Sequence, residues 1–355
     1  MERGRGSGFF APTTIPTANC SPSQQQNRER ELSNGVPPGQ LLGIDVGGTK
    51  IAAALVDAET GGMVRRLETA TGVERGVEAV VADIVTLVHA VAEGEPIAAI
   101  GVGLPELVDS EGEIRSDYLL DWRQGDLEKR LTDIAPVDFE SDVRAAALAE
   151  ATLGVGEPYD LFVYISLGTG ISSTLVQHGV PLVGARGGAL VLSTGPLGMP
   201  CGSCGAWRDF ILEDFASGRA LAERYADATH CAHETVTAQD VLAAAEGGDN
   251  NAIVIVDSAA EALGSALGWL VNVLDPEALV IGGGLGLASG RYHEQLIAST
   301  RAHIWNVAAQ HLPIVPAGLG HDAGVIGAAL AARDRGQQRA VLNVITRESA
   351  ASLAG

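Results

Sequence analysis

Apolar residues follow two patterns along the chain, short runs bounded by glycine and longer stretches at helical spacing. The runs predict buried strands, and the spaced stretches predict amphipathic helices. The two kinds of element follow one another from Leu41 onward, which predicts an α/β fold. Strands are expected at 41–44, 51–57, 97–103 and 136–142, with a hairpin connection at 61–66 leading into a further strand. Helices are expected at 76–93, 125–133 and from just after Asp142.

The second half of the chain repeats the organisation of the first. A strand, a glycine turn and a strand occur at 41–56 and again at 161–177. Helices are then expected at about 211–226, 238–246 and 252–274, followed by the strand ALVIGGGLG and a small-residue helix in HDAGVIGAALAARD. This duplication predicts two related α/β halves with a cleft between them. We assign residues 41–142 plus 320–336 to a small domain and residues 143–319 to a large one.

The two ends of the chain lack this periodicity. Residues 1–40 are rich in Pro, Ser, Gln, Gly and Arg, which predicts a disordered N-terminal extension. The extension is too short and irregular for a winged-helix DNA-binding domain. Residues 337–355 are expected to form a loose tail.

Composition narrows the function. Apolar residues make up 46% of the 355 residues, which is enough for a sizeable core, and 23 Lys and Arg oppose 44 Asp and Glu, for a net charge of −21. This charge argues against nucleic acid and anionic membranes as partners. The most apolar stretch, 252–274, is interrupted by Asp257 and Glu261, and no signal-peptide pattern begins the chain. We expect a soluble, cytoplasmic protein.

Glycine turns carry the chemical signal. The chain has no GxxxxGK[ST] P-loop, and the Rossmann GxGxxG fails because Glu106, Ser173 and Ser289 stand where its last glycine is required. Three turns nevertheless follow buried strands directly, at Asp45–Lys50, Gly168–Gly170 and Gly282–Gly284. One such turn is more often structural. Three in this order, with an Asp in the first, favour nucleotide binding.

A series of motifs resembles the ROK group of repressors, open reading frames and sugar kinases, within the actin-like ATPase superfamily. The resemblance covers about residues 41–335 and rests on LLGIDVGGTKIAAALVD, GVGLPELVD, FESDVRAAALAE, YISLGTGISSTLV, LEDFASG, NVLDPEALVIGGGLG and LGHDAGVIGAALAA. It implies a two-domain, ribonuclease H-like α/β fold with an interdomain cleft. It also implies ATP, Mg2+, a small-molecule acceptor and a homodimer.

The resemblance gives roles to residues at matching positions. Asp45 would hold Mg2+ through water, and Asp142 would accept the proton of the attacking hydroxyl. Asp142 could instead cap the following helix or do both, Asp45 could be a turn residue, and Lys50 could be a solvated charge. The first phosphate turn would comprise Gly47, Gly48, Thr49 and Lys50; the second, Gly168, Thr169 and Gly170; and the adenosine would be flanked by Gly282, Gly283 and Gly284.

The departures from the family pattern concern the acceptor. Val191 and Thr194 stand where ROK sugar kinases carry a sugar-binding Glu and a His that contacts sugar and ligates zinc. Of the zinc cysteines only Cys201 and Cys204 remain, so we expect no zinc. Ser141 replaces an Asn beside Asp142, and Tyr118 lies near another usual Asn. The acceptor-binding residues are expected to be Ser141, Asp142, Glu213 and Glu106, the last of which replaces a small residue.

These departures predict an ATP-dependent kinase for a non-standard acceptor that keeps a hydroxymethyl group. The expected acceptor is a seven-carbon cyclitol of the valienone or valiolone type, phosphorylated on its 7-hydroxyl in aminocyclitol antibiotic biosynthesis, since a branch of ROK kinases acts on such compounds. One alternative is an ordinary hexose or hexosamine kinase of the glucokinase type. The other is a sugar-binding regulator or pseudokinase.

Overall fold

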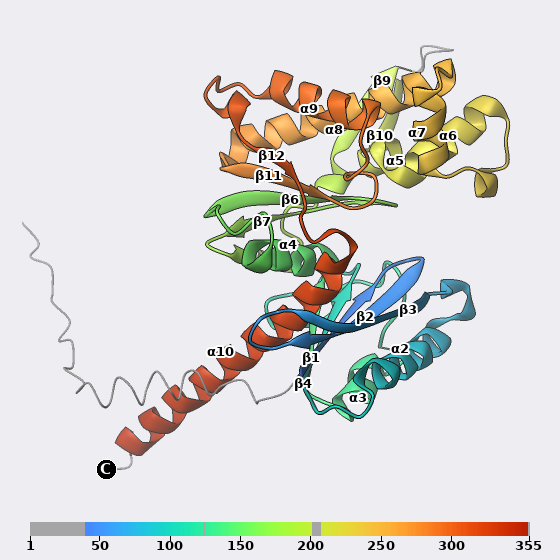
Figure 1. Cartoon of the computed structure of the whole chain (residues 1–355). Coiled ribbons are helices and arrows are strands. Elements are labelled where there is room, and N and C mark those ends of the chain that lie inside the picture. Colours follow the sequence, from blue (N-terminus) through green and yellow to red (C-terminus); the bar gives the residue numbers. More distant parts are fainter. Residues whose placement is uncertain (1–39, 124, 201–206, 354–355) are drawn as a thin grey trace, which may run out of the picture.

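The computed structural model describes residues 40–123, 125–200, 207–353 and no others. The expected extension, apart from Gln40, and the pair Cys201 and Cys204 lie outside the described residues. The described chain forms two domains stacked one above the other, with one helix in contact with both (Figure 1). We keep the names small domain and large domain for them, and each contains one of the two larger sheets.

The small domain is built on a mixed sheet of order β3-β2-β1-β4-β5. Neighbouring strands β1, β2 and β3 are antiparallel, whereas β1, β4 and β5 are parallel. Leu42 and Ile44 of β1 pack with helix α2, and Leu41 on the opposite face packs with helix α10. The elements are β1 Gln40–Val46, β2 Lys50–Asp57, β3 Met63–Ala70, α2 Val77–Ala92, β4 Ile97–Leu104, α3 Leu127–Thr132, β5 Val137–Ser141 and α10 Ala323–Leu353.

The large domain repeats this plan with a sheet of order β12-β11-β6-β7-β8. Phe162 and Tyr164 of β6 face helix α4, and Val163 and Ile165 face the layer that contains α8. The elements are α4 Asp142–Leu153, β6 Leu161–Leu167, β7 Ile171–Gln177, β8 Val180–Pro181, α5 Glu213–Ala216, α6 Gly218–Thr229, α7 Ala238–Glu246, α8 Asn250–Leu274, β11 Ala278–Gly282, α9 Arg291–His303 and β12 Ile314–Pro316. A separate antiparallel hairpin joins β9 Pro196–Pro200 to β10 Trp207–Ile211. Single 3-10 turns lie at Val73–Arg75, Leu192–Thr194, His233–Thr235, Ala309–His311 and Gly320–Asp322.

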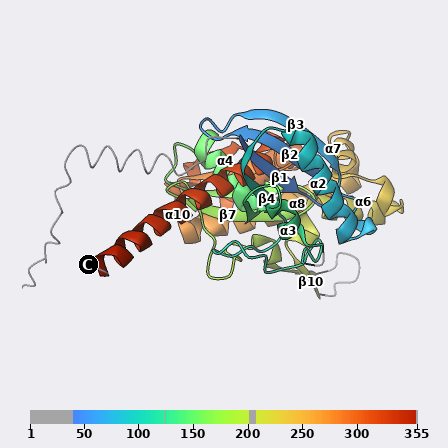
Figure 2. The same ribbon diagram turned by 90° about the horizontal axis from the view of Figure 1, so that it is seen from below.

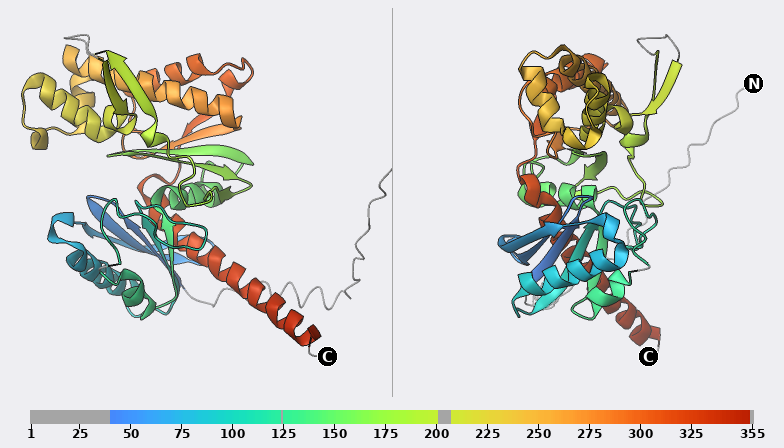
Figure 3. Two further views of the ribbon diagram at one scale, coloured as in Figure 1. Left: turned by 180° about the vertical axis from the view of Figure 1, so that it is seen from behind. Right: turned by 90° about the vertical axis from the view of Figure 1, so that its right-hand side faces the viewer.

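Helices α4 and α10 cross where the domains meet, as the view from behind also shows (Figure 3). The two helix backbones are in direct contact at the crossing, because a Cβ on Gly327 of α10 would overlap the carbonyl of Ala145 in α4. The buried carboxylate of Glu150 in α4 accepts hydrogen bonds from the amides of Val155 (3.0 Å) and Leu319 (2.8 Å). The chain therefore leaves the small domain at α4 and returns at α10 along one tightly packed seam.

The structure differs from the expected elements at two predicted segments, and it also contains helix α9 and the β9–β10 hairpin, which we did not predict. Residues 211–226 do not form one helix, because the chain breaks at Ser217, whose Oγ caps α6 by accepting from the amide of Ala220 (3.2 Å). A tail was expected from residue 337, whereas α10 continues through Leu353 and projects from the body (Figure 2). That segment contains no Gly or Pro to end a helix, and Arg339 forms an ion pair with Asp138.

Helix α8 is long and apolar enough by composition to cross a membrane. Half of its most apolar window is buried, and Leu263 and Leu267 lie in the core of the large domain. Packing within the large domain therefore accounts for the buried half of α8, whereas Val254, Trp269 and Val273 are exposed.

Candidate active site

Two adjoining cavities lie where the domains meet, and both are lined by Pro105, Asp142 and Ser172. One holds about 320 Å³ and is lined by the first two glycine turns. The other holds about 360 Å³ and is lined by residues of the small domain and of the 187–194 segment of the large domain. We call them the phosphate cavity and the acceptor cavity. Asp142 is therefore placed where groups bound in the two cavities would meet.

The first glycine turn joins β1 to β2 and opens into the phosphate cavity. The amide of Gly47 donates to the carbonyl of Lys50 (2.9 Å), and the hydroxyl of Thr71 donates to the carbonyl of Gly47 (2.6 Å). Gly48 and Thr49 line the cavity with Lys50, whose ammonium lies 3.5 Å from the carboxylate of Glu68. The structure thus brings the whole predicted first turn to the cavity.

The second turn is fixed by a contact with the residues between α5 and α6. The amide of Gly168 donates to the carbonyl of Gly170 (3.0 Å), and the amide of Gly218 donates to the carbonyl of Gly168 (2.9 Å). A Cβ on Gly218 would lie 2.6 Å from that carbonyl oxygen, so glycine is required at this contact. Glu213 packs beneath the turn and accepts from the amide of Ile171 (2.8 Å). Glu213 therefore supports the phosphate turn while also lining the acceptor cavity.

The two candidate acidic residues influence each other's ionisation. Burial raises the pKa of Asp45 to about 6, although Lys50 and Arg66 lower it in part. Burial and the nearby charge of Asp45 raise the pKa of Asp142 to about 7, against smaller lowering effects of the Val143 amide, Arg144 and Ser141. The Val143 amide donates to Asp142 Oδ1 at 2.6 Å. A carboxyl group with a pKa near 7 suits general base catalysis at neutral pH.

Asp142 does not occupy the N-cap position of α4, and the Ser141 side chain at that position accepts no capping hydrogen bond. Ser141 is the residue before the first turn of α4, and Asp142 is the first residue of the helix itself. Ser141 ends β5, is buried and lines the acceptor cavity beside Asp142. Asp142 therefore faces the cavities from a helix N-terminus.

Glu106 has a different environment from the expected one. It is buried, and its two carboxylate oxygens accept four hydrogen bonds from the 116–122 loop. The donors are the Ser116 hydroxyl (2.5 Å), the Tyr118 amide (2.8 Å), the Leu119 amide (2.9 Å) and the Trp122 indole (3.2 Å). With this set of donors, Glu106 orders the loop that carries Tyr118 to the acceptor cavity. We assign it this structural role, and because Glu106 also lines the acceptor cavity, its expected contact with the acceptor stays a prediction.

The third glycine turn lies apart from both cavities, since Gly282, Gly283 and Gly284 line neither. A Cβ on Gly282 would overlap the Tyr164 hydroxyl, and Gly283 has a φ of +79° beside the carbonyl of Leu167. Gly284 has no atom within 4 Å of such a Cβ. Packing thus explains the first two glycines, and Gly284 is the one open to a ligand.

Sequence reasoning missed several residues of the phosphate cavity, among them Arg66 and His321. Arg66 lies on β3, pairs with Glu68 and Asp322, and lowers the pKa of Asp45. No motif marks Arg66, because it is one charge of many on a half-exposed strand. His321 begins a motif that we had quoted for its helix alone.

The comparisons with known proteins agree with this fold. The ROK family model matches residues 41–335. The glucokinase of Thermotoga maritima is 30% identical over 321 residues, covering 84% of this chain and 99% of the relative. The N-acetylmannosamine kinase of Yersinia pseudotuberculosis is 31% identical over 304 residues, covering 83% and 99%. The structure of a Streptomyces griseus ROK glucokinase with glucose and AMPPNP has a TM-score of 0.71 at 29% identity, covering 83% and 100%.

The fold and the paired cavities define a sugar kinase of the actin-like ATPase fold, which transfers a phosphoryl group to an alcohol. The chain belongs to the ROK family. The resemblance inferred from the motifs is thereby confirmed, as are the fold class and the kinase activity.

Proposed function

We propose that the protein is an ATP-dependent kinase for the hydroxymethyl group of a hexose or N-acylated hexosamine. The observation that carries the proposal is the position of Asp142, in the lining of both the phosphate and the acceptor cavity. Asp142 takes the proton of the acceptor hydroxyl while the hydroxyl oxygen bonds to the γ-phosphorus, and ADP leaves with the bridging oxygen. The curated relatives that act on glucose and N-acetylmannosamine support this choice of acceptor.

The residues of the first two turns bind the donor. Backbone amides in glycine turns attract phosphate oxygens, and Lys50 and Arg66 add positive charge to the same cavity. Asp45 fits Mg2+, because it is half-buried in the lining of this cavity and carboxylate oxygen is a preferred ligand of that ion. Bound there, Mg2+ would neutralise charge on the phosphates. Gly284 remains our proposed neighbour of the adenosine.

The acceptor cavity also supports a second candidate. Val191 and Thr194 line it where a hexose kinase of this family would present Glu and His, and Ala189 and Leu190 add to the apolar wall. Such a wall suits an acceptor with fewer hydrogen-bonding groups at that position. The seven-carbon cyclitol phosphorylated on its 7-hydroxyl, with its place in antibiotic biosynthesis, is therefore kept as the second candidate.

An ADP-release assay with Mg2+ and ATP tests both candidates. The panel contains glucose, N-acetylmannosamine, fructose and valiolone, with Asp142→Asn as the matched inactive control. Turnover of a hexose or hexosamine that is lost in the control supports the proposal. Turnover of valiolone alone would transfer the assignment to the cyclitol, and acceptor binding without ADP release would indicate the regulator. We extend the proposal to a cytoplasmic homodimer without zinc, to be checked by light scattering and metal analysis.

A further inference from the structure

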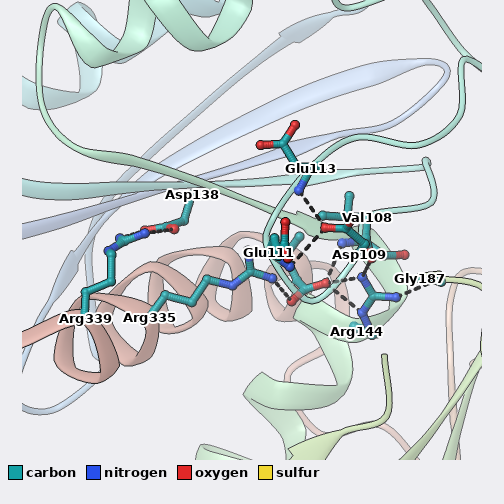
Figure 4. A network of polar contacts seen from close by, with 11 residues as sticks. Val108, Asp109, Glu111, Glu113, Asp138, Arg144, Gly187, Arg335 and Arg339 are labelled. Carbon is teal, nitrogen blue, oxygen red and sulfur yellow. Dashed lines mark hydrogen bonds and ion pairs between the residues drawn. The ribbon is translucent and has the colours of Figure 1, made fainter. Parts of the chain in front are cut away.

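Arg144 connects the two domains and is one of the residues that line the acceptor cavity. Its side chain is 4% exposed, and it lies two residues after Asp142 in helix α4. Nη1 donates to the carbonyl of Gly187 (2.9 Å) in the large domain, and Nη2 donates to the carbonyl of Val108 (2.5 Å) in the small domain. Figure 4 shows the guanidinium between these two segments. One side chain therefore spans the boundary that the acceptor cavity occupies.

The charge of Arg144 is balanced within the same network. Its Nε donates to Glu140 Oε1 at 2.7 Å, and the other oxygen of Glu140 accepts from Arg335 of helix α10 at 3.0 Å. A buried guanidinium needs such a partner, because an isolated buried charge is strongly disfavoured. Glu140 thus holds the guanidinium through Nε and Nη2, the latter 2.5 Å from Oε1, while Nη1 and Nη2 also reach the carbonyls of Gly187 and Val108.

The opposing backbones are shaped to accept this contact. Gly187 has a φ of +77°, and a Cβ there would overlap the carbonyl of Val108. Gly187 is also the first of the large-domain residues 187–194 that wall the acceptor cavity. Glycine at this position lets the wall approach the small domain closely enough for one guanidinium to reach both carbonyls.

We propose that Arg144 is a positioning residue that holds the 187–194 wall against the small domain and so sets the dimensions of the acceptor cavity. The proposal rests on the function proposed above and adds a determinant of acceptor affinity to it. Arg144 acts on the acceptor through the wall, and its influence on the proton transfer is limited to lowering the pKa of Asp142. A lysine would keep the charge, but a single ammonium cannot replace the three directed donor positions.

The test compares Arg144→Lys and Gly187→Ala with wild type, using Arg335→Met as the matched control. Arg335 shares Glu140 with Arg144 but donates to neither carbonyl, so the control should keep the wild-type KM for the acceptor. We expect both test variants to raise that KM about tenfold, which corresponds to about 1.4 kcal/mol, with the KM for ATP within twofold of wild type. An unchanged acceptor KM in folded Arg144→Lys, or an equal rise for ATP and acceptor, would overturn the proposal.

Amide hydrogen exchange gives a readout that needs no turnover. Arg144→Lys should exchange at least tenfold faster at 105–110 and at 183–191, while α2 and α8 keep the wild-type rates. Unchanged exchange in both segments, or faster exchange throughout the chain, would contradict a positioning role. If the wild-type protein phosphorylates no sugar while Arg144→Lys still shows the predicted exchange pattern, the proposed function is refuted and the positioning role remains supported.

Discussion

Replacing Asp142 by Asn should inactivate the protein and also stabilise it at neutral and alkaline pH. Burial and Asp45 raise the pKa of Asp142 from 3.8 to about 7 in the folded protein, whereas an unfolded Asp titrates near 3.9. The folded state therefore binds this proton more tightly than the unfolded state does. The stability that the protonated group contributes is fully present below about pH 4 and is lost as the pH rises towards 7.

The size of the effect follows from the shift in pKa. A shift of about 3 units at about 1.36 kcal/mol per unit gives an upper value of about 4 kcal/mol. Asn carries no charge at any pH, so the variant does not lose this free energy of unfolding as the pH rises. We expect the free energy of unfolding of the variant, relative to wild type, to rise by up to about 4 kcal/mol between pH 4 and pH 8. Its kcat should fall by about 10²–10⁴, the usual contribution of a general base.

Urea denaturation followed by circular dichroism at several pH values measures this difference. Asp57→Asn is the control of opposite sign, because hydrogen bonds from Thr60 hold the pKa of Asp57 below its ordinary value. Wild type should therefore gain stability over that control as the pH rises from the lowered pKa to about 4, and the difference should stay constant from about pH 4 to about pH 8. A pH-independent difference between Asp142→Asn and wild type would refute the burial argument, and a normal kcat would refute the catalytic role.

The remaining predictions concern the supporting structure. Glu106→Gln should lower the free energy of unfolding by about 1–3 kcal/mol, because an amide cannot accept all four hydrogen bonds. It should also speed tryptic cleavage within 115–123, and unchanged cleavage would contradict the proposal that Glu106 orders this loop. Gly101→Ala should cost about 1–3 kcal/mol in a thermal melt, because a Cβ would overlap the carbonyl of Ala328, and a wild-type Tm would be inconsistent with that contact. Chelation of Mg2+ should abolish turnover, and Asp45→Asn should raise the Mg2+ concentration for half-maximal rate, which a titration of activity would show.

The sequence predicted those parts of the fold that depend on local periodicity. The duplicated hairpins and helices α2, α7 and α8 are present within a few residues of the expected bounds. The break at Ser217 and Gly218 was not predicted, because it depends on a contact with Gly168 some fifty residues away. The continuation of α10 was missed because its pattern beyond residue 336 gave no apolar face that we recognised.

The glycine turns of the site could be predicted from the sequence, because their function depends on backbone shape. The roles of single side chains were harder to predict. The turns at 47–50 and 168–170 reach the phosphate cavity as expected, since glycine spacing records their shape. The role of Glu106 could not be read from its own position, because its partners lie ten to sixteen residues further on. Arg144 lies in the FESDVRAAALAE motif, but its contacts with Val108 and Gly187 form only in the folded chain and could not be predicted from the motif.

The seam between α4 and α10 has a mechanical consequence. Both passages of the chain between the domains lie beside the reacting groups, one at Asp142 and the other at Gly324, where a Cβ would lie 2.6 Å from the carboxylate of Asp45. A pivot at this seam displaces nearby atoms least and distant atoms most. A rotation about this seam would therefore change the spacing of the Asp45 and Asp142 carboxylates less than the separation of residues that lie farther from the seam.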